Sequence, residues 1–293
     1  MLEDLAQQGA TDYAAMPMRF SDGQINILTL VSDGEGGFST DDLGPLHEML
    51  PLLSAIFEVY SQRRLSGALL DTYLGAQTGM RVLEGKIRRG DGETIHAVIW
   101  FSDLRDSTRL TEALGRGAYL ALLNDYFDCM AGAVLAHRGE VLKYIGDAVM
   151  AIFPVADADS AHPMAAIDAL AAARDAAARI DRLNAGRAER REERIGFGIA
   201  LHRGEFTYGN IGTPRRLDFT VIGGAANEAA RIEALTKELG ERVLVSGPVA
   251  ESVSEPLRSV GRHTLRGVGA EMELFGLPSD GSEEGEADAE TGQ

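Results

Sequence analysis

Two acidic residues occupy positions where a sheet could bring carboxylates together. Asp103 ends the apolar run Val98-Ile-Trp-Phe-Ser-Asp103, and Asp147 lies with Gly146 between two β-rich runs, a pattern typical of a tight hairpin. In a sheet of order βαββαβ, the end of the first strand approaches that hairpin tip. Converging carboxylates without cysteines or paired histidines favour a hard divalent cation, Mg²⁺ or Mn²⁺, whose remaining ligands are water and substrate phosphates.

A second group of side chains has the donors and acceptors that a nucleotide requires. Asn227 and Arg231 are four residues apart on an expected helix and therefore share one face. Asparagine suits ribose hydroxyls, and arginine suits a charged phosphoryl oxygen. The Thr220 hydroxyl can accept a hydrogen bond from an exocyclic amine, and the Lys143 ammonium can donate one to a ring nitrogen. Adenine presents that amine and that acceptor side by side, whereas guanine would favour an acid in place of the lysine.

Each of these features has an ordinary structural explanation when it is taken alone. Asp147 fits a turn acid, Lys143 fits an edge lysine, and the Asn227 and Arg231 pair fits a solvated helix surface. The sequence contains no Gly-x-x-x-x-Gly-Lys-Ser/Thr loop, so phosphates would be held through metal ions rather than by a P-loop. The presence of both groups in one chain is what favours a nucleotide site.

Composition excludes several classes of function. A formal net charge of −17 over 293 residues argues against a nucleic-acid binder, which needs a basic face. The single cysteine, Cys129, excludes an internal disulfide and a multi-cysteine metal site. The sequence has no secretory signal and no apolar run of about eighteen residues, so we expect a cytoplasmic protein without a membrane span. Residues 279–293 are acidic and predict a disordered tail.

The N-terminal part of the chain predicts a small sensor segment and a linker. Residues 1–17 have no clear period and predict a loose arm, whereas Ser39 predicts a helix start and Pro51 a kink or restart in that helix. A strand, a glycine-rich turn and this helix make residues 1–64 resemble the C-terminal part of a GAF-type domain. Residues 65–92 predict a linker helix, which either transmits a signal or simply packs on the next domain.

From residue 93 onward a regular apolar pattern predicts an α+β domain of residues 93–278. The order of elements is βαββαβ with extra C-terminal strands, which fits an antiparallel, ferredoxin-like sheet with helices on one face. Within this domain, Ile195–Leu201 and Phe206–Ile211 are expected to form a hairpin that turns at Arg203-Gly204.

The candidate residues belong to a set of motifs that resembles the catalytic domain of class III adenylyl and guanylyl cyclases. The motifs are Phe101-Ser-Asp-Leu-Arg-Asp-Ser-Thr108, Lys143-Tyr-Ile-Gly-Asp147, His202-Arg-Gly-Glu205, Gly209-Asn-Ile-Gly212, and Phe219-Thr-Val-Ile-Gly223 followed by Asn227-Glu-Ala-Ala-Arg231. They keep the family's order and spacing from about Ile95 to Leu277. Threonine at position 220 is similar to the subgroup of adenylyl cyclases that has it in place of aspartate.

The resemblance implies an activity and a role for each matched residue. It implies an adenylate cyclase of intracellular signal transduction, which converts ATP to 3′,5′-cyclic AMP and pyrophosphate with two Mg²⁺ or Mn²⁺ ions. It also implies a homodimer whose active sites lie between the two subunits. The matched positions are the metal-binding Asp103 and Asp147, the purine-selecting Lys143 and Thr220, the ribose-orienting Asn227 and the transition-state Arg231.

The chain departs from the family pattern at two places. Asp106-Ser107 adds a carboxylate near the expected metals, and Gly224-Ala-Ala replaces a more polar turn before Asn227. Arg266 is a candidate for binding the terminal phosphates.

Two other functions stay open beside that of an adenylate cyclase. One is that of a guanylate cyclase, which Lys143 and Thr220 disfavour. The other is that of a regulatory module that binds nucleotide without turning it over. A cyclic-dinucleotide synthase on a related sheet would need a Gly-Gly-Asp/Glu-Glu-Phe hairpin, and this hairpin is Ile145-Gly-Asp-Ala148.

Overall fold

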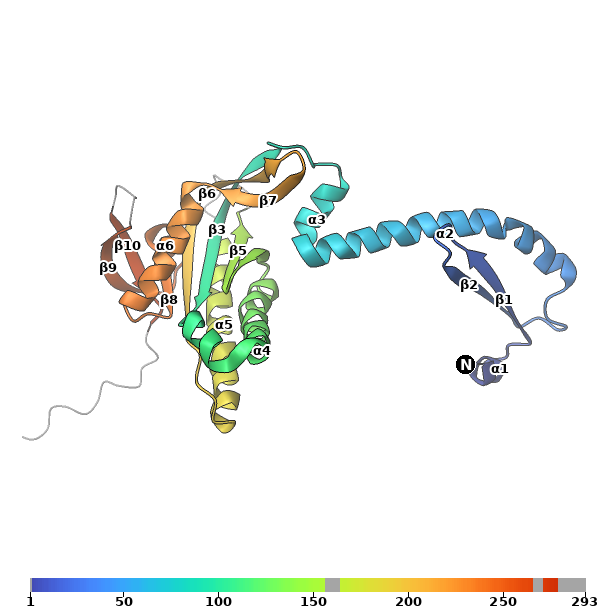
Figure 1. Ribbon diagram of the computed structural model, residues 1–293, viewed down its shortest axis with the longest axis horizontal. Coiled ribbons are helices and arrows are strands. Elements are labelled where there is room, and N and C mark those ends of the chain that lie inside the picture. The colour runs from blue at the N-terminus through green and yellow to red at the C-terminus, as the bar shows by residue number, and fades with distance from the viewer. Residues whose placement is uncertain (1, 156–163, 266–270, 279–293) are drawn as a thin grey trace, which may run out of the picture. The chain divides into compact units, whose positions relative to one another are not determined.

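The computed structural model describes residues 2–155, 164–265 and 271–278, so the predicted acidic tail of residues 279–293 lies outside the described residues. The chain divides into two compact units, Met1–Leu83 and Glu84–Gln293 (Figure 1). Among the described residues, no helix combines the length and the apolar character needed to cross a bilayer.

The first unit consists of a β-hairpin with helices. Its elements are α1 (Leu2–Gln7), β1 (Asp12–Arg19), β2 (Ile25–Ser32), α2 (Thr40–Leu74) and α3 (Ala76–Leu83). Because β1 pairs with β2 along its whole length, the prediction of a loose arm over residues 1–17 is wrong. Met16 and Met18 share one face of β1 and are buried with Leu50 of α2. Only two residues of β1 are buried in this cluster. Two apolar positions are too few to show the alternation that identifies a strand in a sequence.

Helix α2 begins where the sequence predicts but continues through its prolines. Ser39 caps it: the Asp42 backbone N–H donates to the Ser39 hydroxyl, and the Asp42 carboxylate accepts from the Ser39 backbone N–H. The helix does not restart at Pro51. Pro51 is exposed, and water can hydrate a carbonyl that loses its helical partner on that side. The helix ends instead at Gly75, whose φ is 84°.

The core of this unit is small. In its described part the sheet has two strands, and the buried cluster consists of Met16, Met18 and Leu50 with a few half-buried neighbours. The likeness of residues 1–64 to a GAF-type domain therefore stays a prediction. The predicted linker of residues 65–92 starts inside α2 and includes α3.

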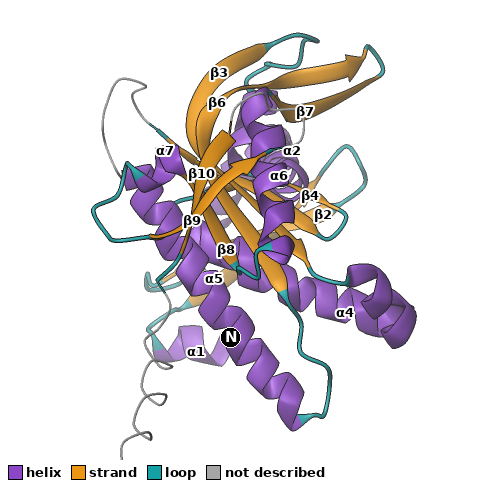
Figure 2. Cartoon of the chain, turned by 90° about the vertical axis from the view of Figure 1, so that its left-hand side faces the viewer, coloured by secondary structure: helices purple, strands orange, loops and turns teal. Residues whose placement is uncertain are grey.

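The second unit is an α+β domain built on a twisted sheet (Figure 2). Its elements are β3 (Gly92–Leu104), α4 (Ser107–Ala136), β4 (Glu140–Ile145), β5 (Ala148–Pro154), α5 (Met164–Glu189), β6 (Phe197–Thr213), β7 (Arg216–Ile222), α6 (Gly224–Glu238), β8 (Val243–Ser246), α7 (Gly247–Ala250), β9 (Arg258–Thr264) and β10 (Glu271–Gly276). The strand order is β4-β5-β3-β6-β8-β10-β9, with β7 paired to β6. The first four strands have the ferredoxin-like order predicted from βαββαβ. Because β6 and β8 are parallel, the sheet is mixed rather than wholly antiparallel.

Helices cover both faces of this sheet, whereas the sequence predicted one. Val98 and Trp100 of β3 belong to the main core, which is formed with α4 and α5. Ala97 and Ile99 alternate with them and pack in a second core with Ala229 of α6. Burial on both faces explains why β3 is a continuous apolar run.

β6 is one continuous strand at the place where a hairpin turn was predicted. Gly204 pairs with Ala97 of β3, and Arg203 pairs with the next residue of that strand. The glycine is required by packing, because a Cβ at position 204 would collide with the Cβ of Ala225 on α6. The hairpin that follows lies instead between β6 and β7.

The β4–β5 hairpin turns at Gly146-Asp147, as the sequence predicts. Ile145 pairs with Ala148, so these two residues form the tip. Gly146 has a φ of 65°, in the left-handed region that costs a residue with a Cβ about 1–2 kcal/mol. The glycine thus sets the conformation that presents Asp147.

We predict that Gly146→Ala lowers the free energy of unfolding of the second unit by about 1 kcal/mol, measured by urea denaturation. The space around Gly146 is open, so the loss would come from the backbone alone. Gly117 in α4 also borders open space and is the matched control. Because Gly117 lies within a helix, Gly117→Ala should stabilise by up to about 1 kcal/mol. A neutral Gly146→Ala variant would contradict the described turn.

Candidate active site

Asp103 and Asp147 lie together in the second unit. Asp103 is the penultimate residue of β3, and Asp147 lies at the tip of the hairpin whose second strand, β5, pairs with β3. Burial, the charge of Asp147 and a side-chain hydrogen bond with Asp147 together raise the pKa of Asp103 to about 6. The backbone N–H of Leu104 donates a hydrogen bond of 3.1 Å to the Asp103 carboxylate, and this hydrogen bond lowers the pKa of Asp103.

This pair of carboxylates has the chemistry of a hard-cation site. The repulsion between two half-buried carboxylates is reduced when a cation binds between them. The part of the chain that the structure describes contains no cluster of three or more His, Cys, Asp or Glu side chains placed to hold a metal. Mg²⁺ is commonly held by one or two carboxylates, with water and phosphates as its other ligands. The donor set therefore fits Mg²⁺ or Mn²⁺, and the role of both aspartates as ligands stays a prediction.

Glu233 of α6 is an acidic group at this site that the sequence analysis missed. Its side chain is buried, and burial together with the charges of Asp103 and Asp147 raises its pKa to about 7. With Asp103 it lines a pocket of about 500 Å³ at the start of α4. A glutamate in a helix ordinarily indicates a solvated surface. The one available signal was its place on the buried stripe of α6, four residues after Ala229.

Asp106 borders the same pocket, but its charge is balanced. The Lys237 ammonium donates a hydrogen bond of 2.8 Å to the Asp106 carboxylate. This hydrogen bond and the lysine charge lower the pKa of Asp106. The extra carboxylate predicted near the metals is thus present, paired with a lysine from α6. Arg266, the candidate for the terminal phosphates, lies outside the described residues.

Lys143 and Thr220 are brought into direct contact by β4 and β7. The Lys143 ammonium donates a hydrogen bond to the Thr220 hydroxyl. It also lies 3.5 Å from a carboxylate oxygen of Asp218, which is two residues before Thr220 on the same face of β7. The sequence analysis did not identify Asp218, because a single acid on an edge strand carries no distinctive pattern.

Asn227 and Arg231 lie one helical turn apart on α6, as their spacing predicts. Asn227 is exposed and Arg231 is half-buried. Within the described part of the chain, no hydrogen bond or ion pair holds either side chain. Both are therefore available to a ligand.

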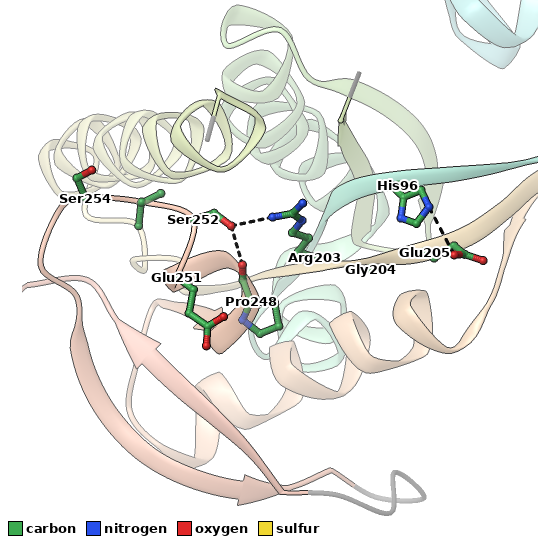
Figure 3. Close-up of a pocket in the computed structure, with 9 residues that line it drawn as sticks. His96, Arg203, Gly204, Glu205, Pro248, Glu251, Ser252 and Ser254 are labelled. Atoms are coloured by element: carbon green, nitrogen blue, oxygen red, sulfur yellow. Dashed lines mark hydrogen bonds and ion pairs between the residues drawn. The ribbon is translucent and has the colours of Figure 1, made fainter. Parts of the chain in front are cut away.

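A second pocket, of about 570 Å³, lies on the face of β6 that points away from α6 (Figure 3). In it the Arg203 guanidinium donates to the Ser252 hydroxyl over 3.0 Å, and His96 lies 3.5 Å from the Glu205 carboxylate. Each of these two basic side chains thus has one polar neighbour within the pocket.

Residues 92–277, more than half of the chain, match the family described as "Adenylate and Guanylate cyclase catalytic domain". The chain belongs to this family.

Individual relatives agree with this assignment. The chain is 37% identical over 174 residues to an adenylate cyclase of Anabaena cylindrica, covering 58% of this chain and 33% of that protein. It is 31% identical over 182 residues to adenylate cyclase 1 of Rhizobium meliloti, covering 60% and 26%. The fold is similar to that of a bacterial light-regulated adenylyl cyclase, with a TM-score of 0.62 at 24% identity, over 78% of this chain and 64% of that one. The chain thus matches no more than a third of the length of these two curated relatives.

We predict that Glu233→Gln removes a pH-dependent loss of stability from the metal-free protein. The pKa of Glu233 is about 7 in the folded chain, above its ordinary value of 4.5. Its contribution to stability is therefore fully present below about pH 4.5 and is lost as the pH rises through 7, by up to about 3 kcal/mol. Urea unfolding in EDTA between pH 5 and pH 8 measures this loss.

The matched control for this prediction is Glu238→Gln, at an exposed position on the same helix. This variant should keep the pH dependence of the wild type. Identical pH dependence in the wild type and in Glu233→Gln would show that Glu233 is not buried beside the aspartates.

Proposed function

We propose that this chain is an adenylate cyclase that converts ATP to 3′,5′-cyclic AMP and pyrophosphate in intracellular signalling. The observation that carries the choice of ATP is the contact between Lys143 and Thr220, in a domain that also pairs Asp103 with Asp147. Membership of the cyclase family supports cyclisation of a nucleoside triphosphate, and the lysine–threonine pair supports adenine as its base.

Base selection follows from the hydrogen-bonding groups of this pair. The Thr220 hydroxyl accepts a hydrogen bond from Lys143 and has a second lone pair for the exocyclic amine of adenine. The Lys143 ammonium has further N–H groups, one of which can donate to a ring nitrogen of adenine. Guanine would place an N–H donor against the lysine, so two donors would face each other. ATP is therefore favoured over GTP.

The remaining residues bind and orient the triphosphate. Asp103 and Asp147 would hold two Mg²⁺ or Mn²⁺ ions, which supply activation of the ribose 3′-hydroxyl and neutralisation of phosphate charge. Asn227 would hold the ribose so that its 3′-oxygen faces the α-phosphorus in line with the leaving pyrophosphate. Arg231 would stabilise the negative charge that develops on the α-phosphoryl oxygens.

The geometry of α6 supports a site that is shared between two copies of the chain. Glu233 faces the aspartates of its own chain, as the effect of their charges on its pKa and its place beside Asp103 in one pocket indicate. Successive residues of an α-helix are about 100° apart, so Arg231 points about 160° away from Glu233, and Asn227 about 120° away. The same α6 therefore cannot present these two side chains to its own aspartates. A head-to-tail homodimer, in which the partner provides Asn227 and Arg231, would complete two equivalent sites.

The direct experiment is to incubate purified protein with Mn²⁺ and either ATP or GTP and to measure the cyclic product. We expect cyclic AMP from ATP, and a lower kcat/KM for GTP by at least about tenfold. Asp103→Asn should reduce cyclic AMP formation at least about 100-fold, because a metal ligand is lost. Asp181→Asn, at a surface ion pair with Arg242, is the matched control and should stay active.

Two results would favour the alternatives. Equal or better turnover of GTP would support a guanylate cyclase. Binding of ATP without any cyclic product would support a regulatory module that holds nucleotide and does not convert it.

We predict that Lys143→Glu lowers the kcat/KM for ATP at least about tenfold and reduces or reverses the preference for ATP over GTP. The reason is that a carboxylate would accept a hydrogen bond from guanine and would repel the adenine ring nitrogen. Steady-state kinetics with both nucleotides measure the ratio, and Lys86→Glu, in an exposed part of the same unit, serves as the control. An unchanged ratio of kcat/KM values would show that Lys143 does not read the base.

A further inference from the structure

The first turn of α6 has no side-chain cap. Gly223 at the N-cap position makes no capping hydrogen bond with a side chain, and Gly224-Ala-Ala, the first residues of the helix, have no polar side chains. The first N–H groups of a helix have no intrahelical partners, and an uncapped start is held in place by tertiary contacts or frays. Asn227 is the fourth residue of α6. Its position therefore depends on what fixes the start of this helix.

A contact between a buried histidine and a half-buried glutamate connects the start of α6 to the sheet. His202 of β6 is only 4% exposed, and its Nε2 lies 2.9 Å from a carboxylate oxygen of Glu228. Burial lowers the pKa of His202 although Glu228 opposes this, so the ring is neutral at pH 7 and its Nε2–H donates to the carboxylate. Glu228 directly follows Asn227 and comes three residues before Arg231. The pair thus acts on the turns that hold both residues.

Close packing adds to this contact on the same face of β6. Gly204, two residues after His202, lies so near Ala225 that a Cβ at position 204 would collide with it. A Cβ at position 223 would lie 3.1 Å from that of Phe206, the next residue on this face. Arg203 and Glu205 point the other way, into the pocket of Figure 3. β6 therefore uses one face to hold the start of α6.

We propose that His202 is a positioning residue for the cyclisation reaction, because its hydrogen bond to Glu228 fixes the uncapped start of α6 and thereby places Asn227 and Arg231. This inference rests on the proposed function and deepens it. Without the histidine donor, the Glu228 carboxylate loses its partner and the helix start can shift. Turnover falls more than ATP binding, because the base and metal contacts come from other elements.

Kinetics with ATP and Mn²⁺ on three variants test the proposal. His202→Phe keeps a ring but removes the donor, and we expect kcat to fall at least about tenfold while KM changes by less than about threefold. His202→Gln keeps an N–H near the position of Nε2 and should retain at least about a third of the wild-type kcat. Ser252→Ala, which removes a hydrogen bond from Arg203 on the other face of β6, is the matched control and should behave as wild type.

Two outcomes would overturn the proposal. One is a wild-type kcat in His202→Phe. The other is an equal loss of kcat in His202→Phe and His202→Gln together with equal falls in melting temperature, which would show that the ring only fills space. Should His202→Phe fold poorly, Glu228→Gln gives the same test, since it weakens the acceptor, and an unchanged kcat in a folded Glu228→Gln would equally overturn the proposal.

Asn227→Ala, measured in parallel, separates this inference from the proposed function. An inactive Asn227→Ala beside a fully active His202→Phe means that only the positioning role fails. A fully active Asn227→Ala means that the proposed role of Asn227 fails, and the inference fails with it.

Discussion

The meeting of two carboxylates at adjoining strand ends is the constraint on which the rest of this domain depends. Asp103 and Asp147 are held half-buried and close enough to raise the pKa of Asp103 to about 6, which is unfavourable for an empty pair of acids. A third acid, Glu233, is buried beside them. This concentration of negative charge has a chemical use when a divalent cation and a triphosphate occupy the site. The turn at Gly146 and the long central strand β3 place the two aspartates next to each other.

Helix α6 connects this acidic site with the proposed nucleotide contacts. One side of the helix packs on the sheet and places Glu233 beside the aspartates, so Asn227 and Arg231 are directed elsewhere. One chain would thus carry two parts of the proposed site that face different directions. Two copies arranged head to tail would bring complementary halves together. In this arrangement His202, through its contact with Glu228 near the uncapped start of α6, would affect a reaction at a site shared with the neighbouring copy.

Local patterns in the sequence predicted which elements carry the candidate residues and the class of the fold, whereas several details depend on contacts that the sequence alone does not show. The hairpin at Gly146 was predictable because a Gly-Asp pair between apolar runs is a local signal. Other positions depend on contacts distant in sequence. Gly204 has the composition of a turn but is required by the close approach of α6. Pro51 lies inside a helix, and the carbonyl that it leaves without an N–H partner belongs to the exposed His47, where water can hydrate it. Glu233 resembles a surface acid until the helix is placed on the sheet, and Met16 and Met18 are too few to mark a strand.

The most direct measurement of the shared site is complementation between two inactive variants. Asp103→Asn and Arg231→Ala should each be inactive alone, since each homodimer lacks the same element in both sites. Mixing them in equal amounts should restore about a quarter of the wild-type activity, because about half of the dimers are mixed and each of these has one intact site. A mixture that stays inactive although the two variants exchange subunits would contradict a site formed between two copies.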